Sequence, residues 1–274
     1  MKLLPSPPAP RRPPSPLGDA RSPLDRAIGA PPRRTANPRA WGILAILALA
    51  AIWGSAAAAQ NDPFLPQRRS MVDDQVRRRG IEQRGLLQAM EAVPRHLFVP
   101  EIHQPQAYED TPVEIAPGKT LSQAYLSALM ISLLELHGNE KVLEIGTGSG
   151  YDAALMSRMV RRVYTIEIDS DLAGRAERTL QTLGYRNVKV RNGDGYRGWP
   201  EEAPFDAILV TAAPPRLPRP LIDQLKIGGR MVVPVGKLVQ DLQVITKTAD
   251  GIEVRKISLV NLVPMEGEVE RDPG

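Results

Sequence analysis

A ten-residue stretch, VLEIGTGSGY from Val142 to Tyr151, constrains the fold more than any other part of the chain. It is an apolar run that leads into Gly146, Gly148 and Gly150. The pattern predicts a buried strand that turns tightly into a helix, because glycine adopts backbone conformations closed to other residues. In open α/β sheets, ligands bind at such a turn, at the carboxyl end of the first strand. The stretch therefore indicates an α/β fold and the place of a binding site.

Short apolar runs alternate with helical patterns after this turn. The apolar runs are VYTIEI, VKV, FDAILV and RMVVPVG, and helices are expected from about Tyr151 and over LAGRAERTLQTLG and PLIDQLKIG. The alternation predicts a mainly parallel sheet covered by helices on both faces. Residues 241–263 favour an antiparallel hairpin added to that sheet. Before the turn, residues 70–81, 83–93 and 123–137 favour helices.

The first 69 residues differ in composition from the rest. Residues 1–39 hold eleven of the 27 prolines and a net charge of +6, which predicts a disordered Pro/Arg-rich extension. Residues 40–59 carry no charge and end in small residues, as in a signal peptide or a membrane anchor. Residues 60–69 are expected to form a linker, and residues 70–274 the folded domain.

Charge and composition exclude several kinds of site. Residues 40–274 carry a net charge of −2, since the whole chain carries +4 and the first 39 residues +6. The domain thus lacks the basic excess typical of a nucleic-acid binder, and no nucleic-acid partner is expected. There is no cysteine, and His96, His103 and His137 lack metal-ligand spacing. We therefore expect neither a metal site nor a thiol nucleophile.

Two nucleotide-binding interpretations compete for the glycine turn, beside an ordinary turn that binds nothing. A dinucleotide fingerprint requires Gly or Ala at position 151, where this chain has Tyr. The spacing Gly-x-Gly-x-Gly, preceded by Glu144, instead favours S-adenosylmethionine, a nucleoside without phosphates.

Two further carboxylates follow neighbouring predicted strands. Glu167 ends the run VYTIEI about twenty residues after the turn, where its side chain can accept hydrogen bonds from both ribose hydroxyls. Asp194, in NGDG after the third strand, is placed to meet an adenine edge. The alternatives are an exposed strand-end charge for Glu167 and a simple turn for Asp194.

The stretch APGKTLSQAY, residues 116–125, resembles the end of a phosphate-binding loop. Such a loop needs a glycine at position 113, where this chain has Val113. Ser122 precedes the helix expected over 123–137 and is predicted to be its N-cap. Because a helix N-terminus attracts anions, Ser122 can cap the helix and contact an anionic ligand at the same time.

Long ordered matches from about Met71 to Pro264 connect the chain to a known family. They include MVDDQVRRRGI, AMEAVPRHLFVP, GKTLSQ, VLEIGTGSGYDAALMS, GDGYRGWPEEAPFDAILVTAA, LIDQLKIGGRMVVPVG and NLVPM. In these stretches the chain resembles the protein-L-isoaspartate O-methyltransferases. It departs from them at Lys119 and Ala124, where the family usually has Gln and Pro, and at Asn261-Leu262, where Arg-Phe is common.

The resemblance implies a class I methyltransferase fold, a Rossmann-like, mainly parallel sheet with N-terminal helices and added C-terminal antiparallel strands. It implies methyl transfer from S-adenosylmethionine, without a metal, to the free α-carboxylate of L-isoaspartyl residues in aged proteins and peptides. Ser122 is the implied catalytic residue, expected to orient the acceptor carboxylate. The implied cofactor-binding residues are Glu144, Gly146, Thr147, Gly148, Gly150, Glu167, Asp194 and Gly195, and the implied substrate-binding residues are Thr120, Ser122, Val263 and Pro264.

Two other functions stay open at this point. One is a class I methyltransferase for another carboxylate or a small molecule, since this fold hosts many functions. The other is a non-catalytic binder of damaged proteins. A cytoplasmic location is expected from the resemblance and because the cofactor is made in the cytoplasm, whereas residues 40–59 favour export or contact with a membrane. A monomer is expected as well.

Overall fold

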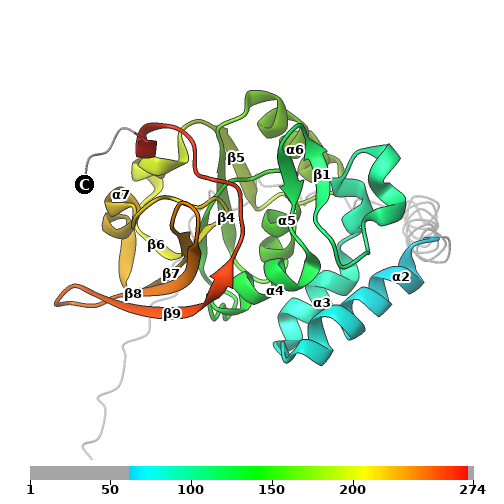
Figure 1. Cartoon of the computed structure of the whole chain (residues 1–274), viewed down its shortest axis with the longest axis horizontal. Coiled ribbons are helices and arrows are strands. Elements are labelled where there is room, and N and C mark those ends of the chain that lie inside the picture. The colour runs from blue at the N-terminus through cyan, green and yellow to red at the C-terminus, as the bar shows by residue number, and fades with distance from the viewer. Residues whose placement is uncertain (1–61, 271–274) are drawn as a thin grey trace, which may run out of the picture. The chain divides into compact units, whose positions relative to one another are not determined.

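A seven-stranded sheet forms the centre of the computed structural model, which describes residues 62–270 (Figure 1). The strand order is β5-β4-β3-β6-β7-β8-β9. The first five of these strands run parallel, and β8 and β9 are antiparallel additions, as predicted. The strands are β3 (Lys141–Ile145), β4 (Arg162–Glu167), β5 (Val188–Asn192), β6 (Phe205–Val210), β7 (Leu225–Val235), β8 (Gln240–Lys247) and β9 (Ile252–Val260).

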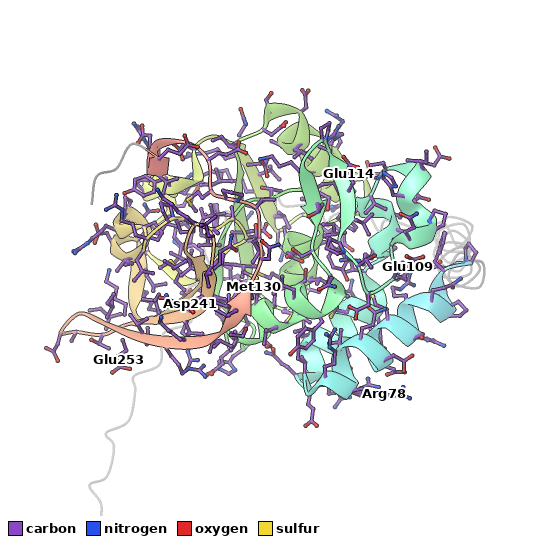
Figure 2. All side chains as sticks on the ribbon, in the orientation of Figure 1. Arg78, Glu109, Glu114, Met130, Asp241 and Glu253 are labelled. Atoms are coloured by element: carbon purple, nitrogen blue, oxygen red, sulfur yellow. The ribbon has the colours of Figure 1, made fainter. Side chains whose placement is uncertain are left out.

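Helices cover both faces of this sheet, which confirms the second part of the prediction. Side chains of β3 alternate between two cores, with Val142 in one and Leu143 in the other. The first core includes side chains of α3, α4, α5 and α6, and the second includes Leu221 of α7. The helices are α3 (Arg84–Ala92), α4 (Ala124–Ser132), α5 (Tyr151–Ser157), α6 (Ser170–Thr182) and α7 (Arg219–Asp223). Figure 2 shows Met130 of α4 inside the molecule and Arg78 and Glu253 at its surface.

The folded region begins earlier than predicted. A helix, α2 (Leu65–Ser70), continues into a π-helical turn over Met71–Val76, so the linker expected at 60–69 is wrong for its described part. Arg68 is only 5% exposed, and its side chain donates to the Glu91 carbonyl at 2.7 Å and the Tyr108 hydroxyl at 3.2 Å. These bonds fix α2 on the domain. The predictions for 1–39 and 40–59 lie outside the described residues.

A small hairpin before α4 was not predicted. It pairs β1 (Val113–Ala116) with β2 (Lys119–Leu121), and Gly118 turns between them with a φ of 72°. The Gly-Lys-Thr of the supposed phosphate loop is therefore the turn and start of β2.

The helix expected over 123–137 is shorter and starts later. It spans Ala124–Ser132, and its N-cap is Gln123, whose backbone is extended and whose side chain makes no capping bond. The predicted N-cap role of Ser122 is therefore wrong, because the chain stays extended for one residue more after β2. At the other end, Glu135 takes a φ of 52° and redirects the chain toward β3.

In the second half of the chain, α7 ends at Asp223, whereas the sequence suggested a helix through Gly228. Leu225 already pairs with Phe205 as the start of β7. Strand β9 is the exposed edge of the sheet. Within residues 62–270, no helix combines the length and apolar character needed to cross a membrane.

Candidate functional site

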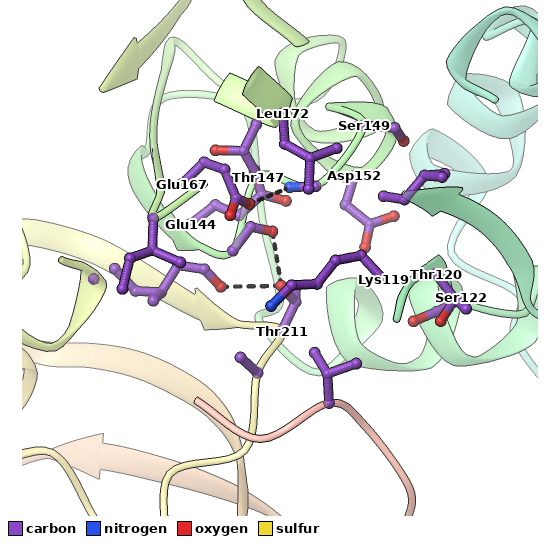
Figure 3. Close-up of a pocket in the computed structure, with 18 of the residues that line it drawn as sticks. Lys119, Thr120, Ser122, Glu144, Thr147, Ser149, Asp152, Glu167, Leu172 and Thr211 are labelled. Atoms are coloured by element: carbon purple, nitrogen blue, oxygen red, sulfur yellow. Dashed lines mark hydrogen bonds between the residues drawn. The ribbon is translucent and has the colours of Figure 1, made fainter. Parts of the chain in front are cut away.

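A cavity lies where β3, β4 and β6 end, and six separate segments contribute to its wall (Figure 3). Most of the residues predicted for cofactor or substrate lie on it: Thr120, Ser122, Glu144, Gly146, Thr147, Gly148, Glu167, Gly195, Val263 and Pro264. Gly150 and Asp194 are not part of its lining. The predicted residues, up to 144 positions apart in the sequence, thus meet at one site.

The glycine turn makes a close passage at the end of β3. Gly146 has a φ of 94°, and a Cβ at this position would lie 2.4 Å from the Thr211 hydroxyl oxygen. That hydroxyl donates to the carbonyls of Ile145 at 3.0 Å and Gly146 at 2.8 Å (Figure 3). Gly150, with a φ of 89°, is the N-cap of α5 and faces Leu180 of α6. Gly146 therefore shapes the cavity wall, whereas Gly150 allows two helices to pack closely.

Glu167 is held rigidly at the end of β4. Its Oε2 accepts from the Gly148 N–H at 2.8 Å (Figure 3), and its Oε1 accepts from the Asp169 N–H at 3.1 Å. Each carboxylate oxygen can accept a second hydrogen bond. Glu167 can thus bind a diol while the glycine turn keeps it in place.

Glu144 is fully buried beneath the same turn. Its Oε2 accepts from Thr165 Oγ1 at 2.6 Å, so Thr165 Oγ1 in turn accepts a hydrogen bond from Thr147 Oγ1, which lies 2.6 Å away. Oε1 of Glu144 has no hydrogen-bond partner among the described residues. Burial raises the pKa of this carboxyl well above its usual range, and the negative charges of Asp152 and Glu167 raise it further. The hydrogen bond from Thr165 lowers the pKa and offsets only part of this rise.

Asp194 uses its carboxylate on the backbone. Oδ1 accepts from the Tyr196 N–H at 2.9 Å, and Oδ2 accepts from the Glu268 N–H at 2.8 Å. The side chain therefore caps the 3-10 turn that follows β5 and anchors the C-terminal segment. Its contact with an adenine edge stays a prediction, while its neighbour Gly195 lies on the cavity wall.

The other side of the cavity carries Thr120 and Ser122 opposite the C-terminal segment. The Ser122 carbonyl accepts from Arg95 Nη2 at 2.5 Å, and Arg95 is fully buried. No hydrogen bond engages Ser122 Oγ among the described residues, so the hydroxyl is available to a ligand. Across the cavity, the Val263 carbonyl accepts from the Ala213 N–H at 2.8 Å.

Lys119, one of the departures from the family pattern, has a partner in the structure. Its ammonium forms an ion pair with Glu266, which follows Pro264 on the C-terminal segment. Both residues line the cavity. The pair therefore links the β1–β2 hairpin to the C-terminal segment at the site.

Sequence reasoning missed Arg95 and Asp152. Arg95 lies 27 residues before Ser122, and nothing in its local pattern indicates the contact. Asp152 lines the cavity from the second position of α5, where an acidic residue is usually interpreted as a favourable charge at a helix N-terminus.

A comparison with known proteins finds one family whose model matches residues 67–270, described as protein-L-isoaspartate(D-aspartate) O-methyltransferase. The chain belongs to this family. A protein-L-isoaspartate O-methyltransferase of Gloeobacter violaceus is 53% identical over 200 residues, covering 72% of this chain and 98% of that protein. One of Syntrophus aciditrophicus is 52% identical over 200 residues, covering 72% and 92%.

Solved structures of protein-L-isoaspartate O-methyltransferases also resemble this chain. One has a TM-score of 0.67 at 30% sequence identity and covers 73% of this chain and 67% of its own. Another, from Plasmodium falciparum in complex with S-adenosyl-L-homocysteine, has a TM-score of 0.64 at 28% identity and covers 73% and 98%. The class I methyltransferase fold implied by the sequence is confirmed. Among the described residues, no group of His, Cys, Asp or Glu is arranged to hold a metal ion.

Proposed function

We propose that the chain transfers the methyl group of S-adenosylmethionine to the free α-carboxylate of L-isoaspartyl residues in proteins and peptides, which initiates their repair. Family membership supports the activity. The observation that carries it is the cavity, whose wall brings together the glycine turn, Glu167, Ser122 and Val263. A methyl donor and an acceptor carboxylate can therefore meet in one place.

The described residues fit the cofactor. Glu167 offers one accepting position on each oxygen for the two ribose hydroxyls. The close passage at Gly146 leaves no room for a side chain on the cavity wall, because the Thr211 hydroxyl fills that space. Oε1 of Glu144 has no hydrogen-bond partner among the described residues, and a ligand in the cavity that Glu144 lines can supply one.

The chemistry requires little acid or base catalysis from the protein. A carboxylate is already deprotonated at neutral pH and can attack directly. The bound cofactor supplies an activated methyl group. The protein holds the acceptor in line with that group and shields it from water. The Ser122 hydroxyl donates a hydrogen bond to the acceptor carboxylate and orients it, while Arg95 fixes the Ser122 backbone. In the methyl ester, the following backbone amide nitrogen then attacks the ester carbonyl and displaces methanol, and hydrolysis of the resulting succinimide gives partly normal aspartate.

A methyl-transfer assay tests the proposal. The purified full chain is incubated with radiolabelled S-adenosylmethionine and either an isoaspartyl peptide or its aspartyl twin of identical sequence. Ester formation on the isoaspartyl peptide alone is the expected result. Ester formation on both peptides, or on neither while another carboxylate is methylated, would indicate a different methyltransferase. Cofactor binding in calorimetry without turnover would indicate a non-catalytic binder.

For location, we propose that the domain works in the cytoplasm, where S-adenosylmethionine is made, as a monomer. N-terminal sequencing of the native protein tests the location. A start at Gln60 would mean removal of a signal peptide and export, and recovery of uncleaved chain in membranes would mean anchoring through residues 40–59. Light scattering of the purified protein gives the oligomeric state.

A further inference from the structure

Lys119 is the single basic residue on the cavity wall within the part of the chain that the structure describes. Its side chain extends from β2, beside Thr120 (Figure 3). Carboxyl groups are more numerous on the same wall, where they belong to Glu144, Asp152, Glu167 and Glu266. Burial raises the pKa of the first two and so favours their neutral forms, but the other two carboxylates still outnumber the one ammonium. An anionic substrate therefore meets one cation in a mainly acidic site.

The hairpin that carries Lys119 does not depend on the ion pair with Glu266. The two side chains are 24% and 51% exposed, and ion pairs at such exposure contribute little to stability. Ile115 and Leu121, one on each strand of the hairpin, are buried and anchor it to the domain.

The C-terminal segment is likewise held without this ion pair, because the backbone is bonded on both sides of Glu266. Before it, the Met265 N–H donates to the Ala213 carbonyl at 2.9 Å. After it, the Glu268 N–H donates to Asp194 Oδ2 at 2.8 Å. Lys119 can therefore exchange its partner without loosening either segment.

The distance from Lys119 to Ser122 indicates which part of a substrate Lys119 can contact. The chain is extended from β2 as far as Gln123, so the three residue steps from Lys119 to Ser122 span about 10 Å. An extended peptide covers the same span in about three residues. A substrate whose acceptor carboxylate lies at Ser122 thus presents a flanking residue to Lys119.

We propose that Lys119 determines substrate specificity by binding the carboxylate of an acidic residue that flanks the isoaspartyl residue, in exchange for Glu266. This inference rests on the proposed function, because it concerns the substrate of that reaction. The ammonium keeps an ionic partner before and after the exchange. Glu266 competes with the substrate for Lys119 and repels its negative charge. The Gln that the family usually has at this position would offer no positive charge.

Methylation of matched peptides by the full chain tests the proposal. Two isoaspartyl peptides are identical except at the positions two and three residues away on each side, where one carries Glu and the other Gln. They therefore differ in charge and hardly in shape. The measured quantity is the charge preference, which is kcat/KM for the acidic peptide divided by kcat/KM for the neutral one.

Lys119→Gln and Glu266→Gln are expected to change the charge preference in opposite directions. The first removes the cation and should lower the preference by about 2- to 5-fold, the range for an exposed ion pair. The second frees the ammonium and removes a competing carboxylate, so it should raise the preference by a similar factor. Both substitutions break the same ion pair, so a purely structural role would affect both variants in the same direction and both peptides equally.

Two further variants serve as controls. Lys119→Arg keeps the positive charge and should keep the wild-type preference. Lys226→Gln breaks another ion pair, with Asp206 at 2.9 Å, but Lys226 is exposed and outside the cavity, so the preference should stay unchanged. High salt should bring the wild-type preference toward that of Lys119→Gln, because it screens exposed charges. Thermal unfolding monitors the fold of each variant.

Two results would overturn the proposal. An unchanged charge preference in Lys119→Gln or in Glu266→Gln would show that no flanking carboxylate takes the place of Glu266. A shift of both variants in the same direction would reduce the ion pair to a structural link. Absence of ester formation on both peptides with the wild-type chain would instead refute the proposed function itself, so the two failures are distinguishable.

Discussion

Ser122 is positioned through its backbone and not through its side chain. Arg95 holds its carbonyl, and the next residue, Gln123, is the true N-cap position of α4. The hydroxyl is consequently not used in capping, which separates the two roles that the sequence allowed it to combine. The Ser122 hydroxyl can therefore orient a ligand without the loss of a capping hydrogen bond that stabilises α4.

For Ser122→Ala, we expect kcat/KM for an isoaspartyl peptide to fall by about 10- to 100-fold, because a hydrogen bond to a charged group is lost. The affinity for S-adenosylmethionine should change little. Steady-state kinetics and calorimetry measure the two quantities. Ser258→Ala on the exposed strand β9 is the control, and full activity of Ser122→Ala would rule out the proposed role.

Glu144 gives a pH-dependent prediction. Its pKa in the folded protein lies above the usual 4.5, so above pH 4.5 the folded state binds more protons than the unfolded state. The stability of the ligand-free protein therefore falls as the pH rises through that window. Glu144→Gln removes this dependence, and its free energy of unfolding relative to wild type should increase between about pH 4.5 and neutrality.

Urea unfolding at several pH values measures this difference. The buried His96 has a lowered pKa and makes stability depend on pH in the opposite direction below its usual 6.5, but it is present in both proteins and cancels in the comparison. A difference that stays constant with pH would contradict the raised pKa of Glu144.

At the scale of elements, the glycine turn and the β1–β2 hairpin both line the cavity. The turn follows from a local pattern of three glycines after an apolar strand, and the structure confirms it. The hairpin was missed because its strands are short and their pairing brings Lys119 and Thr120 to the cavity only through the tertiary fold. Its ion pair to Glu266 joins residues 147 positions apart.

Two glycine substitutions distinguish the cost of backbone strain at a positive φ from the cost of a steric clash in the glycine turn. Gly146→Ala and Gly184→Ala both place a side chain at a positive φ, of 94° and 82°, but only the first meets another atom, the Thr211 hydroxyl. Gly184→Ala should lower the free energy of unfolding by about 1–2 kcal/mol from backbone strain alone. Gly146→Ala should lower it more, and it alone should weaken cofactor binding. Urea unfolding measures the two losses of stability, and calorimetry measures cofactor binding. Equal losses of stability for the two variants would contradict a steric clash at Gly146.

At the scale of the whole molecule, the domain includes residues before Ser70. The helix α2 contributes Arg68, whose side chain also pairs with Asp62 at 2.7 Å. A chain that starts at Met71 would lose these contacts and leave the Tyr108 hydroxyl and the Glu91 carbonyl without a donor from Arg68.

Two truncations test this boundary. We expect residues 62–274 to keep methyl transfer, and residues 71–274 to be less stable by about 2–5 kcal/mol, because buried hydrogen bonds to a charged group are lost. Urea unfolding and the peptide assay measure both. Arg69→Ala in the longer fragment, at an exposed neighbour of Arg68, should change little. Equal stability of the two fragments would place the boundary at Met71.

The sequence by itself determined the parallel sheet, the glycine turn, and the positions of Glu144 and Glu167 at strand ends. These features depend on local periodicity and on the rule that parallel strands end at one edge. Only the tertiary structure decided that Ser122 is not a cap, that Asp194 bonds to the backbone, and that Asp152 lines the same cavity as Glu144. Contacts of this kind join distant segments such as those of Arg95 and Ser122, and no local pattern encodes them, because they depend on how the layers of the fold pack.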